Sequence, residues 1–458
     1  MIERPLETPL SPKTWSVGTL TYTAAGLVAI FFWLLFGDFA WSMRDRSVGP
    51  MASWYLESLK VSNLWFGLIL SSFPAFVGMI LGPVISVKSD RHRGRWGRRI
   101  PFLLVTTPLA AVGMLGIAWT PVLAQWIHGR FPEQNHTIVT VVSFGMFWAA
   151  FECATIAGAA IFGGLINDVV PPHLLGRFYG LFRAVSLIDG MIFNYWIMGK
   201  VPVYYTLILT VIGIFYGVTF MLVCFKVKEG DYPPPTPRDS QFAKGPAVIW
   251  REIRQYAREC FANPYYVSIF FMAMFANLAF SPVNIFALPY AKSLGMDMDT
   301  YGKYLALTYL ISLCLAFFLG WLADAFHPLR VALAMLFGYL LVTVWASIFA
   351  TTQSGFVIAW VLHGVLSGCF FTTAASLGQR LFPREKYSQF SSAAGLVSSA
   401  AFMSIGPLVG MIIDTSGNVY RYTFVTGAGL AVIGLTISIF VYRRFLELGG
   451  HQNYQAPL

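Results

Sequence analysis

The stretch Ser89-Asp-Arg-His-Arg-Gly-Arg-Trp-Gly-Arg-Arg-Ile-Pro-Phe102 separates two long apolar runs. It holds five arginines and the single aspartate Asp90, whereas the runs at 62–86 and 100–122 hold no charged side chain. A bilayer core about 30 Å thick is crossed by about 20 apolar residues of helix. The stretch is therefore predicted to be a loop that joins two membrane-spanning helices.

Ten more apolar runs of this kind lie outward from the loop. The twelve expected spans are 20–41, 62–86, 100–122, 137–163, 179–199, 202–225, 263–290, 304–323, 331–350, 355–379, 391–413 and 422–442. Backbone groups in lipid must be paired within their own span, so runs this long predict helices. We expect no cleaved signal peptide, because the first run is too long and eleven more follow it.

The composition excludes several classes of protein. Hydrophobic residues make up 57% of the 458 residues, charged residues only 11%, and the mean hydropathy is +0.64. A soluble globular chain carries about 25% charged residues. The net charge of +10 comes from short clusters between apolar runs, which is typical of membrane loops and not of nucleic-acid binding. Five scattered cysteines without CxxC spacing indicate apolar filler, not a disulfide scaffold.

Lys and Arg residues predict the orientation of the spans. With the N-terminus inside, 22 of the 31 fall on the inner side and 8 on the outer side, while Arg183 lies within a span. Positive charge collects on cytoplasmic loops, so both termini are predicted to be cytoplasmic. Because both termini lie on the same side of the membrane, the number of spans must be even.

A hydrophilic segment divides the chain into three parts. We expect an N-terminal six-helix bundle over 1–225, a cytoplasmic linker over 226–262 and a C-terminal six-helix bundle over 263–458. The linker begins with a proline-rich stretch and ends at 247–261 with apolar residues at helical spacing and arginines on the remaining face. This pattern predicts an amphipathic helix on the anionic membrane surface, or alternatively a docking site for a protein partner.

The two halves resemble each other at one place. Asp90 lies at the inner end of the second span, and Asp324 lies at the inner end of the eighth, 234 residues later. An arginine precedes the next span in both halves, at Arg99 and Arg330. Many secondary transporters are built from such duplicated units, with the substrate site near mid-membrane between the repeats.

The loop also carries a resemblance to a known family. Asp90-Arg91, then Arg95-Trp-Gly-Arg-Arg99, then Pro101-Phe102, resembles the signature loop of the major facilitator superfamily, in the form of its glycoside–pentoside–hexuronide and sucrose-type branch. The resemblance implies an all-α integral membrane fold, with twelve transmembrane helices in two pseudo-symmetric bundles. Ser86 replaces a glycine that is usual in this loop, and span two lacks the aspartates of sodium-using melibiose-type carriers, so a sodium site is not expected.

The inner loops predict a cytoplasmic gate. Asp90 at a helix C-terminus is unfavourable next to the helix dipole and needs a cationic partner, which a neighbouring helix end could supply as a latch. The alternatives are arginines that only set the topology or contact lipid phosphate, and ordinary helix capping. The gate candidates are Asp90, Arg91, Arg95, Gly97, Arg98, Arg99, Asp168, Arg177, Asp324 and Arg330.

Three charges inside the spans predict proton coupling. Glu152 in span four and Asp189 in span five lie near mid-depth, and Arg183 lies one and a half turns nearer the inside. An ionisable group at the bilayer centre is costly and usually marks a pathway. Two buried carboxylates near each other favour the protonated form of one of them. We expect Glu152 or Asp189 to carry the proton with Arg183 as counter-ion. The alternative is a static ion pair that fixes helix packing.

Polar and aromatic side chains in the spans are candidates for binding sugar hydroxyls and ring faces. The candidates are Asp38, Asn194, Asn277, Asn284, His363 and Trp148. Asp38 could instead face the outer water, His363 could be a packing residue, and Trp148 could belong to the interfacial belt or the core.

These features predict a secondary active transporter that carries a sugar or glycoside with a proton by alternating access. The alternative is a carrier of another small solute, such as an organic anion or drug, possibly an exchanger. We expect no enzyme activity, since no P-loop, HExxH or metal-spaced His/Cys motif is present. We expect no metal or cofactor beyond the coupling proton, no nucleic-acid partner, a monomer, and a place in the plasma membrane, or the inner membrane of a bacterium.

Overall fold

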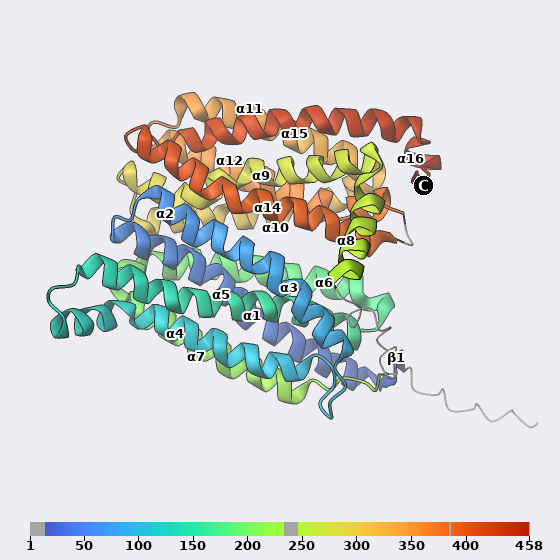
Figure 1. Cartoon of the computed structure of the whole chain (residues 1–458), viewed down its shortest axis with the longest axis horizontal. Helices are drawn as coiled ribbons and strands as arrows, with labels where there is room; N and C mark the ends of the chain where they lie inside the picture. Colours follow the sequence, from blue (N-terminus) through green and yellow to red (C-terminus); the bar gives the residue numbers. More distant parts are fainter. Residues whose placement is uncertain (1–13, 233–245, 384–385, 458) are drawn as a thin grey trace, which may run out of the picture.

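Two bundles of long helices lie side by side in the computed structural model, which describes residues 14–232, 246–383 and 386–457 (Figure 1). A short hairpin of β1 (Trp15–Val17) and β2 (Leu20–Tyr22) and the C-terminal α16 (Gly450–Asn453) lie at one end of the molecule. We call this end proximal and the opposite end distal.

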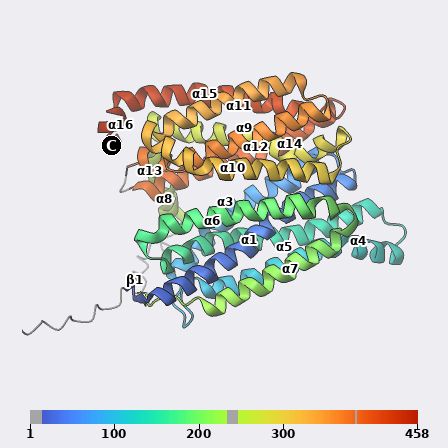
Figure 2. The ribbon, with the colours of Figure 1, turned by 180° about the vertical axis from the view of Figure 1, so that it is seen from behind.

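The first bundle consists of the helices before residue 227. They are α1 (Ala24–Ser58), α2 (Asn63–Gly67) continued by the π-helix η1 (Leu68–Ser72) and α3 (Phe73–Arg91), α4 (Ile100–Arg130), α5 (His136–Val169), η2 (Pro172–Leu174), α6 (Leu175–Ile192) with η3 (Phe193–Ile197) and η4 (Met198–Lys200), and α7 (Val201–Lys226). The chain reverses near Tyr204, whose backbone is not helical, so α6 and α7 run in opposite directions (Figure 2).

The second bundle follows the short α8 (Pro246–Phe261). Its helices are α9 (Pro264–Ser293), α10 (Met298–Phe326), α11 (Pro328–Phe349), α12 (Gln353–Ala374), α13 (Leu377–Leu381), α14 (Tyr387–Thr415) and α15 (Tyr422–Glu447). A helix therefore lies over each of the twelve predicted spans. The boundaries 1–225 and 263–458 stay a prediction.

Ten helices among the described residues are long and apolar enough to cross a membrane. One of them, Pro172–Lys226, covers two predicted spans, the fifth and the sixth. The remaining predicted span, the eighth, corresponds to α10, which has 29 residues. The all-α membrane fold is confirmed.

The largest error in a predicted boundary concerns the end of the first span. The first span was expected to end at residue 41, but α1 continues for 35 residues to Ser58. Arg44 and Arg46 were assigned to an outer loop and instead lie inside this helix. The reason is burial, because Arg44 is only 1% exposed and its guanidinium is enclosed by aromatic rings.

The described residues of the two halves share buried side chains at the distal end. One buried cluster contains residues of both halves, and in it Phe66 of the first half stacks on Phe286 of the second with ring centroids 5.6 Å apart. A second cluster contains residues of the second half, such as Phe270 and Phe390. The described hydrogen bonds that join the halves lie near mid-depth or at the distal end.

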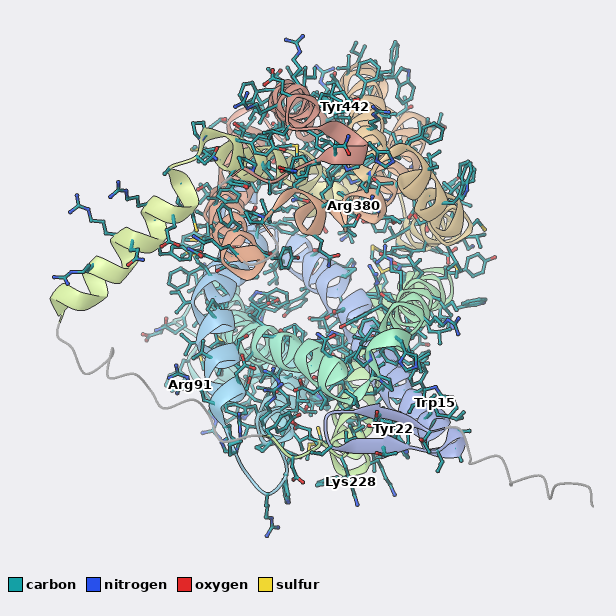
Figure 3. All side chains as sticks on the ribbon, turned by 90° about the vertical axis from the view of Figure 1, so that its right-hand side faces the viewer. Trp15, Tyr22, Arg91, Lys228, Arg380 and Tyr442 are labelled. Carbon is teal, nitrogen blue, oxygen red and sulfur yellow. The ribbon has the colours of Figure 1, made fainter. Side chains whose placement is uncertain are left out.

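The predicted amphipathic helix is observed as α8, which projects from the proximal end of the bundle in Figure 3. The proline-rich stretch at 233–237 lies outside the described residues. Near the end of α8, Glu259 accepts hydrogen bonds from Gln255, Gln389 and Lys386, which hold the pKa of its carboxyl at about 2. These contacts tie α8 to the start of α14. Binding of α8 to lipid stays a prediction.

Candidate functional site

The middle of α1 carries four charged residues within nine positions. A helix of 35 residues is about 52 Å long, so Asp38, Arg44, Asp45 and Arg46 lie in its central third. Successive helical residues point in different directions, and these side chains accordingly form two separate polar clusters. Charged groups at this depth are costly and mark a pathway.

The first cluster surrounds a cavity of about 270 Å³ between α1 and α5. Its lining includes the charged residues Arg44, Asp45 and Glu152 and the aromatic residues Trp41 and Trp148. Rings and paired charges of this kind suit a ligand with one apolar face and several hydroxyl groups.

Arg44 is held in place on several sides. Its guanidinium carbon lies 3.9 Å from the Trp41 ring centroid and 5.0 Å from that of Tyr216. Its Nη2 atom is 2.5 Å from Asp45 Oδ1, whereas its buried Nε atom has no hydrogen-bond partner among the described residues. A planar guanidinium stacked on a ring keeps its N–H donors in one direction. Stacking and the bond to Asp45 therefore fix the guanidinium at the wall of the cavity.

The second cluster contains two buried carboxylates, Asp38 on α1 and Asp189 on α6. Both oxygens of Asp189 and Oδ2 of Asp38 lack a hydrogen-bond partner among the described residues. The nearby cation is Arg46, which donates to Ser186 Oγ at 2.9 Å and to the Tyr309 hydroxyl at 3.3 Å. Because Tyr309 belongs to α10, this cluster lies where the two halves meet.

The predicted proton-coupling trio is not brought together. Glu152 lines the cavity of the first cluster, while Asp189 lies in the second beside Arg46 and Asp38. Arg183 is exposed, and the described residues form no ion pair between Arg183 and either carboxylate. Arg46 thus takes the place that we expected for Arg183. Asp38 was predicted near the outer end of its span, but it lies mid-helix because α1 is longer than predicted.

His363 of α12 belongs to a polar chain in the second bundle. The Tyr339 hydroxyl donates to the Ala279 carbonyl and lies 3.0 Å from His363 Nδ1. On its other side the ring approaches Asn284, whose Oδ1 atom lies 3.0 Å from Nε2 and accepts a hydrogen bond when Nε2 carries a proton. The polar chain thus runs from the Ala279 carbonyl through Tyr339 and His363 to the exposed side chain of Asn284.

The other substrate candidates make local contacts. The Asn194 amide donates to the Gly190 carbonyl at 2.7 Å, and its oxygen is buried without a partner among the described residues. Asn277 donates to the Ala273 carbonyl and lines a separate cavity of about 300 Å³ in the second bundle. Trp148 donates to the Ile69 carbonyl and lines the first cluster. The candidates are therefore divided among several places, and their roles stay predictions.

The predicted gate contains a dense charge cluster at the proximal end. Arg99 bonds to Asp90 at 2.5 Å, to Ser89 Oγ at 2.6 Å and to Asp168 at 3.2 Å. Arg98 bonds to both Asp168 oxygens at 2.5 and 2.9 Å. Asp90 is the next-to-last residue of α3, the arginines precede α4 and Asp168 is near the end of α5. These bonds accordingly join three helices of the first bundle to one another, whereas a latch between bundles would need a partner in the second.

Glu229, which follows α7, completes this cluster. Its carboxylate accepts from the backbone N–H groups of Arg98, Arg99 and Ile100 at 3.0, 2.8 and 2.7 Å, and from the Tyr232 hydroxyl at 2.9 Å. Burial and the neighbouring Glu229 raise the pKa of Tyr232, which keeps this hydroxyl protonated as a donor. Glu229 thus caps the N-terminus of α4 from a distant part of the chain.

The remaining gate candidates are not part of this set of bonds among the described residues. Gly97 has φ +97°, Arg95 lies over the Trp96 ring at 5.3 Å, Arg91 and Arg177 are exposed, and Arg330 donates to the Tyr442 hydroxyl at 2.7 Å. Asp324 lies in α10, and its side chain is outside the described residues.

Two adjacent glycines of α5 provide a test of the charge cluster. A Cβ on Gly164 would lie 2.7 Å from the Arg99 guanidinium carbon, which cannot move aside without losing its partners, whereas a Cβ on Gly163 meets nothing within 4 Å. We expect Gly164→Ala to lower the free energy of unfolding by about 1–3 kcal/mol. Gly163→Ala should raise it slightly, because alanine favours helix. Thermal unfolding in detergent measures both, and equal effects would contradict the role of Arg99.

Sequence reasoning missed four functional candidates, Arg44, Asp45, Arg46 and Glu229. A signal existed for the first three, since the apolar pattern resumes at Ser47 and continues to Leu56. Glu229 carried no comparable signal, because a helix cap from a residue 130 positions away leaves no local pattern. Among the described residues, no group of three or more His, Cys, Asp or Glu side chains could hold a metal ion.

Comparisons with known proteins agree with this architecture. Residues 269–447 match the family model of the Major Facilitator Superfamily. A general alpha-glucoside permease of Schizosaccharomyces pombe is 24% identical over 181 residues. This match spans 39% of the present chain and 31% of the permease.

Two solved structures share the fold. One is a bacterial homolog of the human lysosomal transporter Spinster in an inward-facing and unoccupied conformation, with a TM-score of 0.66 and 13% sequence identity. The match covers 94% of this chain and 98% of the Spinster homolog. A D-xylose-proton symporter has a TM-score of 0.61 at 14% identity and covers 91% of this chain and 96% of its own. The predicted resemblance to the superfamily is confirmed, and the fold is that of membrane transporters.

Proposed function

We propose that this chain, a transporter of the Major Facilitator Superfamily, carries a sugar or glycoside across the membrane together with a proton. The observation that carries the proposal is the unpartnered carboxylate of Asp189, buried near mid-depth where the two bundles meet. A buried carboxylate without hydrogen-bond donors is costly, and a bound proton removes most of that cost.

The cavity beside α1 supports the sugar part of the proposal. Arg44, Asp45 and Glu152 offer both donors and acceptors there, and Trp41 and Trp148 offer ring faces. The likeness to a permease named for alpha-glucosides and the fold shared with a D-xylose-proton symporter point to the same substrate class.

The distribution of contacts between the bundles supports alternating access. The halves are joined at mid-depth and at the distal end, whereas each has its own buried residues at the proximal end. We place the proximal end in the cytoplasm of a plasma membrane or bacterial inner membrane, following the excess of Lys and Arg there. The structure then corresponds to an inward-facing state.

Transport in proteoliposomes tests the proposal. Purified protein is reconstituted with a pH-sensitive dye inside, and disaccharides, glucosides and uronides are added outside with or without sodium. We expect sugar-dependent internal acidification that needs no sodium. Uptake of an organic anion or cation without any response to sugars would instead establish the transport of another solute.

A further inference from the structure

The first helix of the second span begins at the distal end without a cap of its own. Ser62 precedes α2 and its side chain forms no capping hydrogen bond. The first N–H groups of a helix have no partner within the helix, and they carry a partial positive charge. A helix start in this position therefore attracts an acceptor from elsewhere, preferably an anion.

That acceptor comes from the other half of the molecule. Asp414, next to the last residue of α14, accepts from the backbone N–H of Asn63 at 3.0 Å with Oδ1 and from that of Leu64 at 3.0 Å with Oδ2. The Asn63 side-chain amide also donates to Asp414 at 2.8 Å. One carboxylate thus caps a helix that lies 350 residues away in the chain.

Two more residues complete the contact. The Asn63 amide donates to Asn418 Oδ1 at 2.9 Å, and its oxygen accepts from the Tyr420 hydroxyl at 3.0 Å. Asn63 is 6% exposed, and each polar atom of its side chain has a partner. The backbone of Asn418 has φ +65°, a left-handed conformation that asparagine tolerates better than most residues and that follows the end of α14.

The helices behind this contact are packed closely. A Cβ on Gly410 of α14 would collide with the Asn63 carbonyl, and one on Gly67 of α2 would collide with the Gly406 backbone. One turn further along, Ser71 Oγ donates to the Phe402 carbonyl at 3.2 Å. The two helices are therefore in close contact at the distal end of this structure.

From these contacts we propose that Asp414, Asn63, Asn418 and Tyr420 form a distal lock that holds the outer side of the transporter shut. Separation of the bundles at this end leaves the α2 terminus uncapped and the carboxylate without its donors. The lock thereby favours the closed state. The ratio of closed to open molecules depends on the difference in free energy between the two arrangements. The effect of the lock on transport rests on the proposed function, whereas its effect on the separation of the bundles does not.

Distances between spin labels test the lock. Labels at Glu133→Cys and Thr351→Cys lie on exposed distal loops of the two halves, in a background with the five native cysteines replaced by alanine. We expect one narrow distance distribution in the otherwise unchanged protein. Asp414→Asn should add a longer distance and lower the ratio of closed to open molecules about tenfold.

Asp297→Asn is the matched control. Asp297 caps α10 at the same end of the molecule, with its Oδ1 2.8 Å from the Thr300 nitrogen, but both residues belong to the second half. This substitution removes the charge of a helix-capping carboxylate without separating the bundles. Unchanged distances in Asp414→Asn would overturn the proposal, and so would an equal shift in Asp297→Asn.

Tyr420→Phe covers the case in which Asp414→Asn does not fold. It removes one hydrogen bond to Asn63 and should lower the ratio of closed to open molecules about threefold. An unchanged ratio in this variant would then overturn the lock. These measurements contain neither sugar nor a proton gradient, so failure here leaves the proposed function intact, and failure of the transport assay leaves the lock intact.

Discussion

In proteoliposomes with an inward proton gradient of two pH units, Asp189→Asn should abolish sugar accumulation. For one proton per sugar, each pH unit supplies about 1.4 kcal/mol, so this gradient supports about 100-fold accumulation in the unchanged protein. Asparagine resembles a protonated aspartate and cannot release a proton. The variant should therefore only equilibrate sugar, with an internal-to-external ratio of about one.

Sugar exchange at equal pH separates loss of coupling from loss of folding. Asp189→Asn should keep this exchange, since no net proton movement is needed. Asp299→Asn is the control, because Asp299 is a half-exposed carboxylate paired with Lys303 and should accumulate sugar normally. If Glu152→Gln abolished accumulation while Asp189→Asn did not, the proton site would lie in the cavity of Glu152.

Arg44→Gln should weaken sugar binding about 100-fold. The guanidinium lies between Trp41 and Tyr216, bonds to Asp45 and presents an unpartnered Nε atom. Hydrogen bonds to a charged group are worth about 1.5–3 kcal/mol, and the upper part of this range corresponds to about 100-fold. The half-saturation constant for sugar exchange measures this change.

The control for Arg44→Gln is Arg130→Gln. Arg130 also lies over a tryptophan ring, with its guanidinium carbon 5.6 Å from the Trp126 centroid, but it is exposed at the distal end of α4. We expect its half-saturation constant to be unchanged. If both variants bound sugar as the unchanged protein does, the cavity beside Arg44 would not be the sugar site.

The apolar pattern predicted the helices well and their ends poorly. All twelve spans contain a helix, because long runs without charge can bury their backbone in lipid only in this form. The end of α1 was misplaced because a charged residue usually ends a span. Arg44 does not end it, since Trp41, Tyr216 and Asp45 supply the contacts that lipid cannot.

The charged candidates were found more readily than their partners. Asp189 and Glu152 stood out in sequence because a carboxylate within an apolar run is rare. Their neighbours did not, and Asp189 lies beside Arg46 of another helix, whereas Arg183 of its own helix was expected. The proximal charge cluster was likewise predicted as a set, while its cap, Glu229, was not.

Sequence alone determined the membrane fold and the signature loop, because hydrophobic length and charge are properties of each segment by itself. Tertiary structure decided which side chains share a site. Asp38 with Asp189, Arg44 with Tyr216, and Asn63 with Asp414 come from helices far apart in the chain. Their pairing depends on how the helices pack and rotate about their axes, which no local spacing of residues encodes.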